Sequence, residues 1–154
     1  RMTRENDVQL YDGMRRQIKG GYAEKSIPYD GWKLYTGCQH PSEQLYRRKY
    51  RGAQVFYYGP SERSRGLAAS IQQALIEFQD PDNTRQEKAN EDYYLLRKET
   101  VPTVICECGF MSNAAEEALL KSEMYQEKTA WAISVGIVRY LNGSTEKGNI
   151  EHDR

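Results

Sequence analysis

The sequence has no long apolar run and no excess of either charge. No stretch approaches the roughly 18 to 20 apolar residues that a membrane-spanning helix needs, and no hydrophobic segment of a signal peptide is present. The 22 lysines and arginines balance 22 aspartates and glutamates, which excludes the overall basic field typical of nucleic-acid-binding proteins. We therefore expect no membrane span and no nucleic-acid partner for these residues.

Aliphatic side chains are scarce in one part of the chain. Residues 19–50 contain only three residues of the set Val, Ile, Leu, Met and Phe, whereas residues 101–141 contain thirteen. A core can be built from the second stretch but hardly from the first. The first fifty residues predict an edge strand within 1–10, a marginal strand at 32–36 and otherwise loop, with an atypical segment at 20–50 that could be disordered.

From Arg51 onward the periodicity predicts regular structure. A strand is expected at 51–58, followed by a helix that Ser61 caps and that ends at the turn signals of 80–83. Leu67, Ile71, Leu75 and Phe78 form the apolar stripe of this helix, which leaves Gln72 among its solvent-facing residues.

The rest of the chain predicts two more strands and two more helices. Residues 93–96 form a short strand candidate, and 101–108 is an apolar run typical of a strand covered on both faces. Asn113 with Glu116 gives a capping-box-like start to a helix over 114–121. A longer helix begins at Ser122 and is expected to stop at 142–143. We predict an α/β fold, with a mixed or mostly parallel sheet flanked by helices and incomplete at the N-terminus.

The length of 154 residues suffices for one domain. We assign residues 1–143 to one partial domain, atypical over 20–50, and 144–154 to a polar tail. The chain begins at Arg1 rather than at a methionine, which predicts that it is a piece of a longer protein.

Glu107 is the first candidate for chemistry. It lies near the carboxyl end of the predicted buried strand, where open α/β sheets collect their sites. In a regular strand, Val104, Cys106 and Cys108 share one face while Ile105 and Glu107 share the other. Burial there would raise the pKa of the carboxyl toward the range that suits a general base or acid, although a salt-bridged structural glutamate is the alternative.

Other candidates have weaker patterns. The three cysteines are an odd number, which excludes a complete disulfide framework. Cys38 and His40 with Cys106 and Cys108 offer four zinc ligands, but each pair has one intervening residue where structural zinc sites use at least two. The basic run 47–49 between two tyrosines could contact phosphates or an anionic polymer, and a solvated basic face is the commoner meaning.

Several segments resemble the zinc-dependent N-acetylmuramoyl-L-alanine amidases, and most closely their germination-type branch, which acts on spore cortex peptidoglycan. The resemblance is strong over about ninety residues from Arg51 and weak over the first ten. The segments are Met2–Glu5 with Asp7, Gly52–Gln54 with Phe56–Tyr58, Val101–Pro102, Glu107–Asn113, Glu117, Leu119–Leu120, Tyr125–Gln126, Gly136–Ile137 and Tyr140–Leu141.

The resemblance implies a zinc ion held by a histidine, a glutamate and a second histidine, with a further glutamate that polarises the metal-bound water. Glu107 matches this last position and is the expected catalytic residue, acting as the amide between the lactyl group and L-alanine is cleaved. His40 stands near the second histidine as a candidate zinc ligand, although its neighbours differ from the family pattern. The other two ligand positions fall before Arg1.

The collapse of the resemblance over 20–50 suggests a hypothesis about the gene, namely that this segment is translated out of frame. Codons for Cys38–Pro41 can, shifted by one base, read Ala-Ser-Ile-His, which suits the family. A gene sequence in which no shifted frame restores the family strand would contradict it.

We therefore expect a peptidoglycan hydrolase of the cell envelope or spore cortex, with zinc as cofactor and peptidoglycan as partner, and inactive in this form. The alternative is a non-catalytic fragment that binds glycan or a protein partner through its aromatic and basic N-terminal region.

Overall fold

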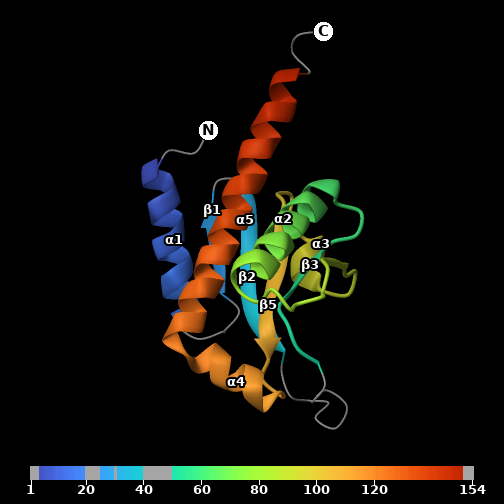
Figure 1. The fold of residues 1–154 in the computed structure, drawn as a ribbon. Helices are drawn as coiled ribbons and strands as arrows, with labels where there is room; N and C mark the ends of the chain where they lie inside the picture. The colour runs from blue at the N-terminus through green and yellow to red at the C-terminus, as the bar shows by residue number, and fades with distance from the viewer. Residues whose placement is uncertain (1–3, 20–24, 30, 40–49, 151–154) are drawn as a thin grey trace.

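The computed structural model describes residues 4–19, 25–29, 31–39 and 50–150 (Figure 1). In chain order, the elements are α1 (Arg4–Lys19), β1 (Lys25–Tyr29), β2 (Trp32–Gln39), β3 (Gln54–Tyr57), α2 (Glu62–Phe78), β4 (Lys88–Ala89), α3 (Tyr94–Arg97), β5 (Thr103–Phe110), α4 (Ala114–Lys121) and α5 (Glu123–Ile150).

The described strands form one mixed sheet in the order β1-β2-β5-β3-β4. The central strand β5 pairs in parallel with β2 and antiparallel with β3. At the two edges, β1 runs antiparallel to β2 and the short β4 runs parallel to β3. This arrangement confirms the predicted α/β class with a mixed sheet.

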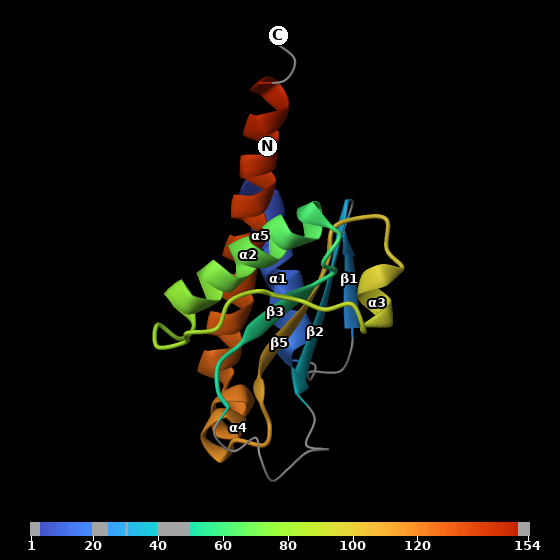
Figure 2. The ribbon, with the colours of Figure 1, turned by 90° about the vertical axis from the view of Figure 1, so that its right-hand side faces the viewer.

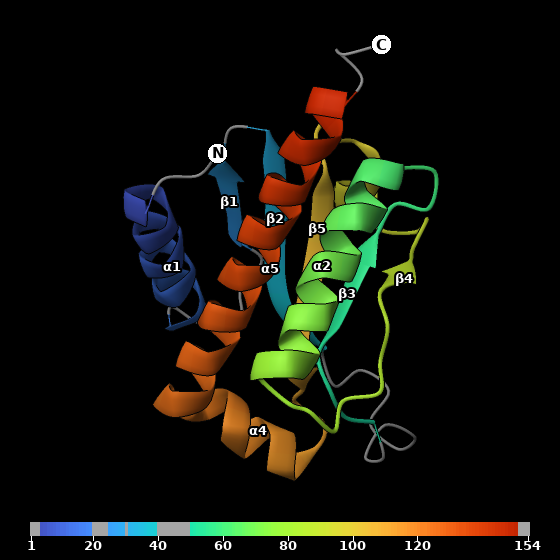
Figure 3. The ribbon, with the colours of Figure 1, turned by 45° about the horizontal axis from the view of Figure 1, so that its top comes forward.

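Three helices cover one face of the sheet. Figure 2 shows α1, α2 and α5 on one side of the strands and α3 on the other, and Figure 3 shows α5 lying between α1 and α2. The core lies between these helices and the sheet, where its largest fully buried side chains are Trp32, Leu10, Met14, Ile18, Leu34, Leu67, Ile71, Leu75, Leu120, Ile133 and Ile137. The other face, apart from α3, is therefore where the sheet can offer polar side chains.

The first fifty residues hold more structure than the sequence predicted. The expected edge strand within 1–10 is wrong, because α1 occupies Arg4–Lys19. Leu10, Met14 and Ile18 recur every four residues and are all buried, which is the stripe of an amphipathic helix. The marginal strand at 32–36 is confirmed and extends to Gln39, whereas β1 was predicted as loop.

Helix α2 begins as predicted, because the Ser61 side chain accepts a hydrogen bond from the Ser64 amide at 3.2 Å. The solvent-facing position predicted for Gln72 is wrong. Its side chain is buried, accepts from the Val55 amide at 2.9 Å and donates to the Ala53 carbonyl at 3.1 Å. Burial of the Gln72 amide costs little because both its oxygen and its nitrogen are hydrogen-bonded. These two bonds connect α2 to β3.

Two further boundaries differ from the prediction. Residues 93–96 were expected to be a strand, but α3 spans Tyr94–Arg97. The expected stop at 142–143 is wrong, because α5 continues through Asn142 and Gly143 to Ile150 and projects beyond the sheet (Figure 1). Glycine lowers helix stability but does not by itself end a helix. No helix in the described ranges is long and apolar enough to cross a membrane.

The crossing of α2 and α5 requires a glycine. A Cβ atom at Gly136 would lie 2.5 Å from the Ile71 Cα atom, so the two backbones meet without an intervening side chain. The hydroxyl group of Ser70 also donates to the Gly136 carbonyl at 2.7 Å. This contact fixes the height at which α5 packs over the sheet.

Candidate active site at the carboxyl ends of β2 and β5

Glu107 lies on the central strand, on the face that α1, α2 and α5 do not cover. Val104, Cys106 and Cys108 are fully buried beneath those helices, whereas Ile105 and Glu107 are half-buried, which confirms the predicted alternation. In the sheet register, Glu107 stands between Gly37 of β2 and Gln54 of β3. Because β2 and β5 are parallel, the carboxylate lies toward the edge where both strands end.

Tyr93 holds the Glu107 carboxylate. Its hydroxyl group donates to the Glu107 Oε1 atom at 3.0 Å, and its ring packs edge-on against Phe56 with centroids 5.7 Å apart. A donor fixed in this way orients the carboxylate. Sequence reasoning assigned no role to Tyr93, because its approach to Glu107 depends on the path of the chain between α2 and β5.

Arg85 stands at the same edge. Its Nη1 atom donates to the Gln54 Oε1 atom at 3.0 Å, and Gln54 is the residue directly opposite Glu107 on β3. Its guanidinium group lies over the ring of Phe110, 4.7 Å from the centroid. Glu107, Gln54 and Arg85 therefore form a continuous polar row across the end of β5.

Glu116 joins the ends of two strands. Its carboxylate is buried, and it accepts from the Gly52 amide at 2.5 Å and from the Phe110 amide at 2.8 Å. Gly52 has a φ of +91°, which favours glycine, and a Cβ atom there would lie 2.4 Å from the Asn83 Oδ1 atom. The cap predicted at Asn113 is confirmed. The predicted capping box is wrong, because the Glu116 carboxylate binds the Gly52 and Phe110 amides and not the amide of Asn113.

We expect Glu116→Gln to lower the free energy of unfolding by about 2 kcal/mol, because one of two buried amides then loses its acceptor. Urea denaturation of both proteins measures the change. Glu117→Gln is the matched control, since Glu117 lies on the same helix and pairs at the surface with Lys121; its effect should stay within about 0.5 kcal/mol. Equal stability of Glu116→Gln and the wild type would show that the two hydrogen bonds of the Glu116 carboxylate contribute nothing to the free energy of unfolding.

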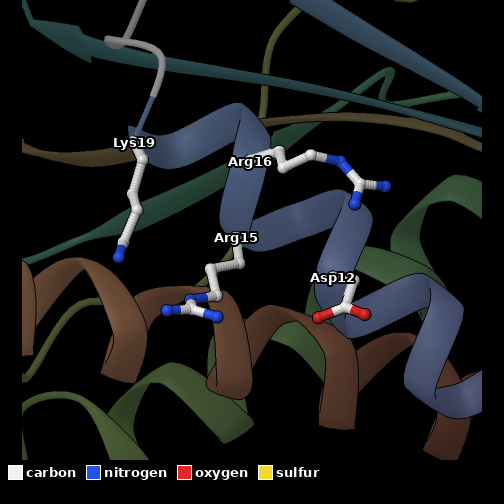
Figure 4. A pocket seen from close by; sticks show the side chains of 4 residues that line it. All are labelled: Asp12, Arg15, Arg16 and Lys19. Atoms are coloured by element: carbon white, nitrogen blue, oxygen red, sulfur yellow. The ribbon is translucent and has the colours of Figure 1, made fainter.

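The surface of the described part includes the two following hollows. One, of about 400 Å³, adjoins the end of β5 and is lined by Met111–Ala115 and Glu117. The other, of about 460 Å³, lies along α1 and is lined by Asp12, Arg15, Arg16 and Lys19. Figure 4 shows Arg15 and Lys19 pointing toward α5, where they pair with Glu127 at 2.9 Å and Glu123 at 2.5 Å. Two of the three cations that line the α1 hollow are therefore engaged by α5.

Comparison with known proteins identifies the family. Residues 42–139 match the N-acetylmuramoyl-L-alanine amidase family, which is well over half of the chain. This chain belongs to that family. The germination-specific N-acetylmuramoyl-L-alanine amidase of Bacillus subtilis is 34% identical over an alignment that covers 96% of this chain and 62% of the relative. The chain thus spans less than two thirds of that relative's length.

Solved amidase structures share the fold. The CwlD amidase of Clostridioides difficile, solved in complex with the GerS lipoprotein, is 34% identical with a TM-score of 0.64, covering 92% of this chain and 66% of that one. The amidase AmiC2 of Nostoc punctiforme is 26% identical with a TM-score of 0.59, covering 71% of this chain and 56% of that one. The chain is therefore a member of the germination-type branch of this hydrolase family.

Members of this amidase family are generally zinc-dependent, but the described residues of this chain do not form a zinc site. Within ranges 4–19, 25–29, 31–39 and 50–150, no three His, Cys, Asp or Glu side chains are grouped so that they could hold a metal ion. His40, the candidate ligand, lies outside these ranges. Both the family ligand set and the alternative Cys and His module therefore stay untested predictions.

The thiols of the amidase chain lie on the face opposite Glu107. Cys106 and Cys108 are fully buried, and half-buried Cys38 packs against the same core. Burial, followed by the neighbouring Cys108, raises the pKa of the Cys38 thiol. Contact with Cys106, followed by burial, raises the pKa of the Cys108 thiol. Both thiols are therefore protonated and unreactive at neutral pH.

We expect the amidase chain to lose stability as the pH rises above about 8.5, the ordinary pKa of a thiol. The unfolded chain then releases protons that the folded chain retains, so unfolding becomes easier, by at most about 1.4 kcal/mol per pH unit for each thiol. Urea denaturation between about pH 8 and 9.5 measures this slope. Cys38→Ser removes one titrating group and should flatten it; an unchanged slope in that variant would contradict the assignment.

Proposed function

We propose that this chain carries the catalytic glutamate of an N-acetylmuramoyl-L-alanine amidase, which hydrolyses the amide between the lactyl group of muramic acid and L-alanine. The observation that carries the proposal is the placement of Glu107. It is a half-buried carboxylate at the carboxyl end of a central strand, oriented by the Tyr93 hydroxyl group and located inside the segment that matches the family.

The arrangement suits proton transfer. A water molecule beside Glu107 attacks the lactyl carbonyl carbon while the carboxylate accepts the proton of that water. As the carbon–nitrogen bond breaks, the same proton passes to the nitrogen of the departing L-alanine residue. The hydrogen bond from Tyr93 keeps the carboxylate in place through both transfers.

The substrate is peptidoglycan, and the place of action is the cell envelope. These proposals rest on the names of relatives, which include cell wall amidases of staphylococci as well as the germination-specific amidase of Bacillus subtilis. For this chain alone, we propose that it binds no stoichiometric zinc and does not cleave muropeptides, since the described residues supply no three-donor group.

One experiment separates the amidase from the alternative, a non-catalytic fragment that binds glycan or a partner. Residues 50–143 replace the matching region of the Bacillus subtilis amidase, and release of the stem peptide from muropeptides is measured. The proposal predicts hydrolysis by this chimera. A chimera that folds, as judged by circular dichroism, but does not cleave would favour the binding fragment. The chain alone is assayed in parallel for zinc content and cleavage.

A further inference from the structure

Arg85 is a cation held in one orientation at the site. Its Nε atom donates to the Arg51 carbonyl at 2.7 Å and its Nη1 atom to the Gln54 side chain at 3.0 Å. The guanidinium group lies 4.7 Å from the ring centroid of Phe110 and 5.8 Å from that of Tyr50, within the range of cation–π attraction. Two hydrogen bonds and two rings thus restrict a side chain that is usually flexible.

This guanidinium group has no carboxylate partner within the described ranges. Arg15, Arg51 and Arg139 each have a carboxylate oxygen within 2.9 Å, whereas no described Asp or Glu comes within 4.0 Å of Arg85. A guanidinium group has five N–H donors, and only two of those of Arg85 donate to described residues. The end of the group, with Nη2 and the second hydrogen of Nη1, is left for a ligand.

The position of Arg85 relative to Glu107 determines which part of a substrate Arg85 contacts. Gln54 is bonded to Arg85 and faces Glu107 across the antiparallel pair, where opposing Cβ atoms are about 5 Å apart. A substrate whose scissile amide lies at Glu107 therefore reaches Arg85 with a group one residue away. A planar fork of N–H groups matches a carboxylate better than any neutral group.

We propose that Arg85 determines substrate specificity by binding a carboxylate that the stem peptide carries on the residue after L-alanine. This inference rests on the proposed amidase function, since it takes the scissile amide to lie at Glu107. It assigns the row formed by Glu107, Gln54 and Arg85 a direction, with the sugar on the Glu107 side and the peptide on the Arg85 side. Arg85 selects the acidic form of the peptide against a form whose carboxylate is amidated.

Two soluble probes test the proposal. N-acetylmuramoyl-L-alanyl-D-glutamate and N-acetylmuramoyl-L-alanyl-D-isoglutamine differ in one carboxylate, which is an amide in the second. Isothermal titration of the full chain should show about tenfold tighter binding of the acid. In Arg85→Gln, the two affinities should agree within about twofold, with the affinity for the isoglutamine form unchanged. Arg63→Gln is the matched control, because Arg63 is an exposed arginine near the start of α2 and should keep the preference.

Each result decides the question. Equal affinity of the wild type for both probes overturns the role of Arg85 and leaves the amidase proposal intact. If folded Arg85→Gln loses the same factor of affinity for both probes, Arg85 supports the strand ends and does not select the substrate. That result also overturns the proposal. Binding of neither probe to the wild type contradicts the proposed function as well. If Arg85→Gln does not fold, Arg85→Lys serves in its place, and an undiminished preference in that variant overturns the proposal.

Discussion

Replacing Glu107 by glutamine is expected to lower amide hydrolysis by the chimera by a factor of about 10³. Glutamine has nearly the same size, and its carbonyl oxygen can accept the hydrogen bond that Tyr93 now donates to Glu107. The substitution therefore removes the proton acceptor without opening a cavity. The rate of release of stem peptide from muropeptides is the measurement, and the melting temperature should change little.

Glu117→Gln provides the control for this prediction. Glu117 lies on α4, which follows β5 directly, and its carboxylate pairs with Lys121 at the surface. Glu117→Gln also replaces a carboxylate by an amide but leaves Glu107 and Tyr93 unchanged, so its rate should stay within about twofold of the parent chimera. Retention of more than about a tenth of the rate in Glu107→Gln would rule out Glu107 as the general base.

Replacing Gly136 by alanine is expected to lower the free energy of unfolding by about 3 kcal/mol. The added Cβ atom would lie 2.5 Å from the Ile71 Cα atom, and backbone cannot move aside as a flexible side chain can. Helices α2 and α5 must then separate, which loosens the packing of Leu67 and Ile133 in the core. Thermal unfolding should show a melting temperature lower by roughly 6 to 12 °C.

The same helix contains the control. A Cβ atom at Gly143 would meet nothing within 4 Å, so Gly143→Ala keeps the packing and gains helix propensity. We expect it to raise stability by about 0.5 to 1 kcal/mol. The pair of variants separates steric contact from propensity. Similar behaviour of both would mean that α2 and α5 do not meet at Gly136.

The fold could be predicted where periodicity and capping agree in sequence. The N-cap residues Ser61 and Asn113 place the starts of α2 and α4, and the apolar run at 101–108 places β5 within two residues. The prediction failed where tertiary contacts decide the outcome. Helix α1 is stabilised by three buried residues against α5 and by surface ion pairs such as Arg15 with Glu127, and its low content of aliphatic residues hid this.

The candidate site divides in the same way. Glu107 could be proposed from the sequence because strand alternation and a family motif both mark it. Tyr93, Arg85 and Glu116 could not, because each reaches the site from a segment distant in sequence from its partner. The Arg85 side chain contacts Gln54, 31 residues earlier, and Glu116 binds the Gly52 amide, 64 residues earlier. No local pattern encodes such pairings.

The pairing of β2 with β5 has a consequence for synthesis on the ribosome. Lys33 of β2 lies opposite Thr103 of β5, so the partner of β2 is made about 70 residues later. At 5 to 20 residues per second, this delay lasts roughly 4 to 14 seconds. During that time, Trp32 and Leu34, which are buried in the finished protein, can pair with β1 but have neither β5 beside them nor helix α5 to cover them. The nascent chain therefore exposes the apolar side chains of the β1–β2 hairpin, which are a binding site for a chaperone, until β5 and α5 have been synthesised.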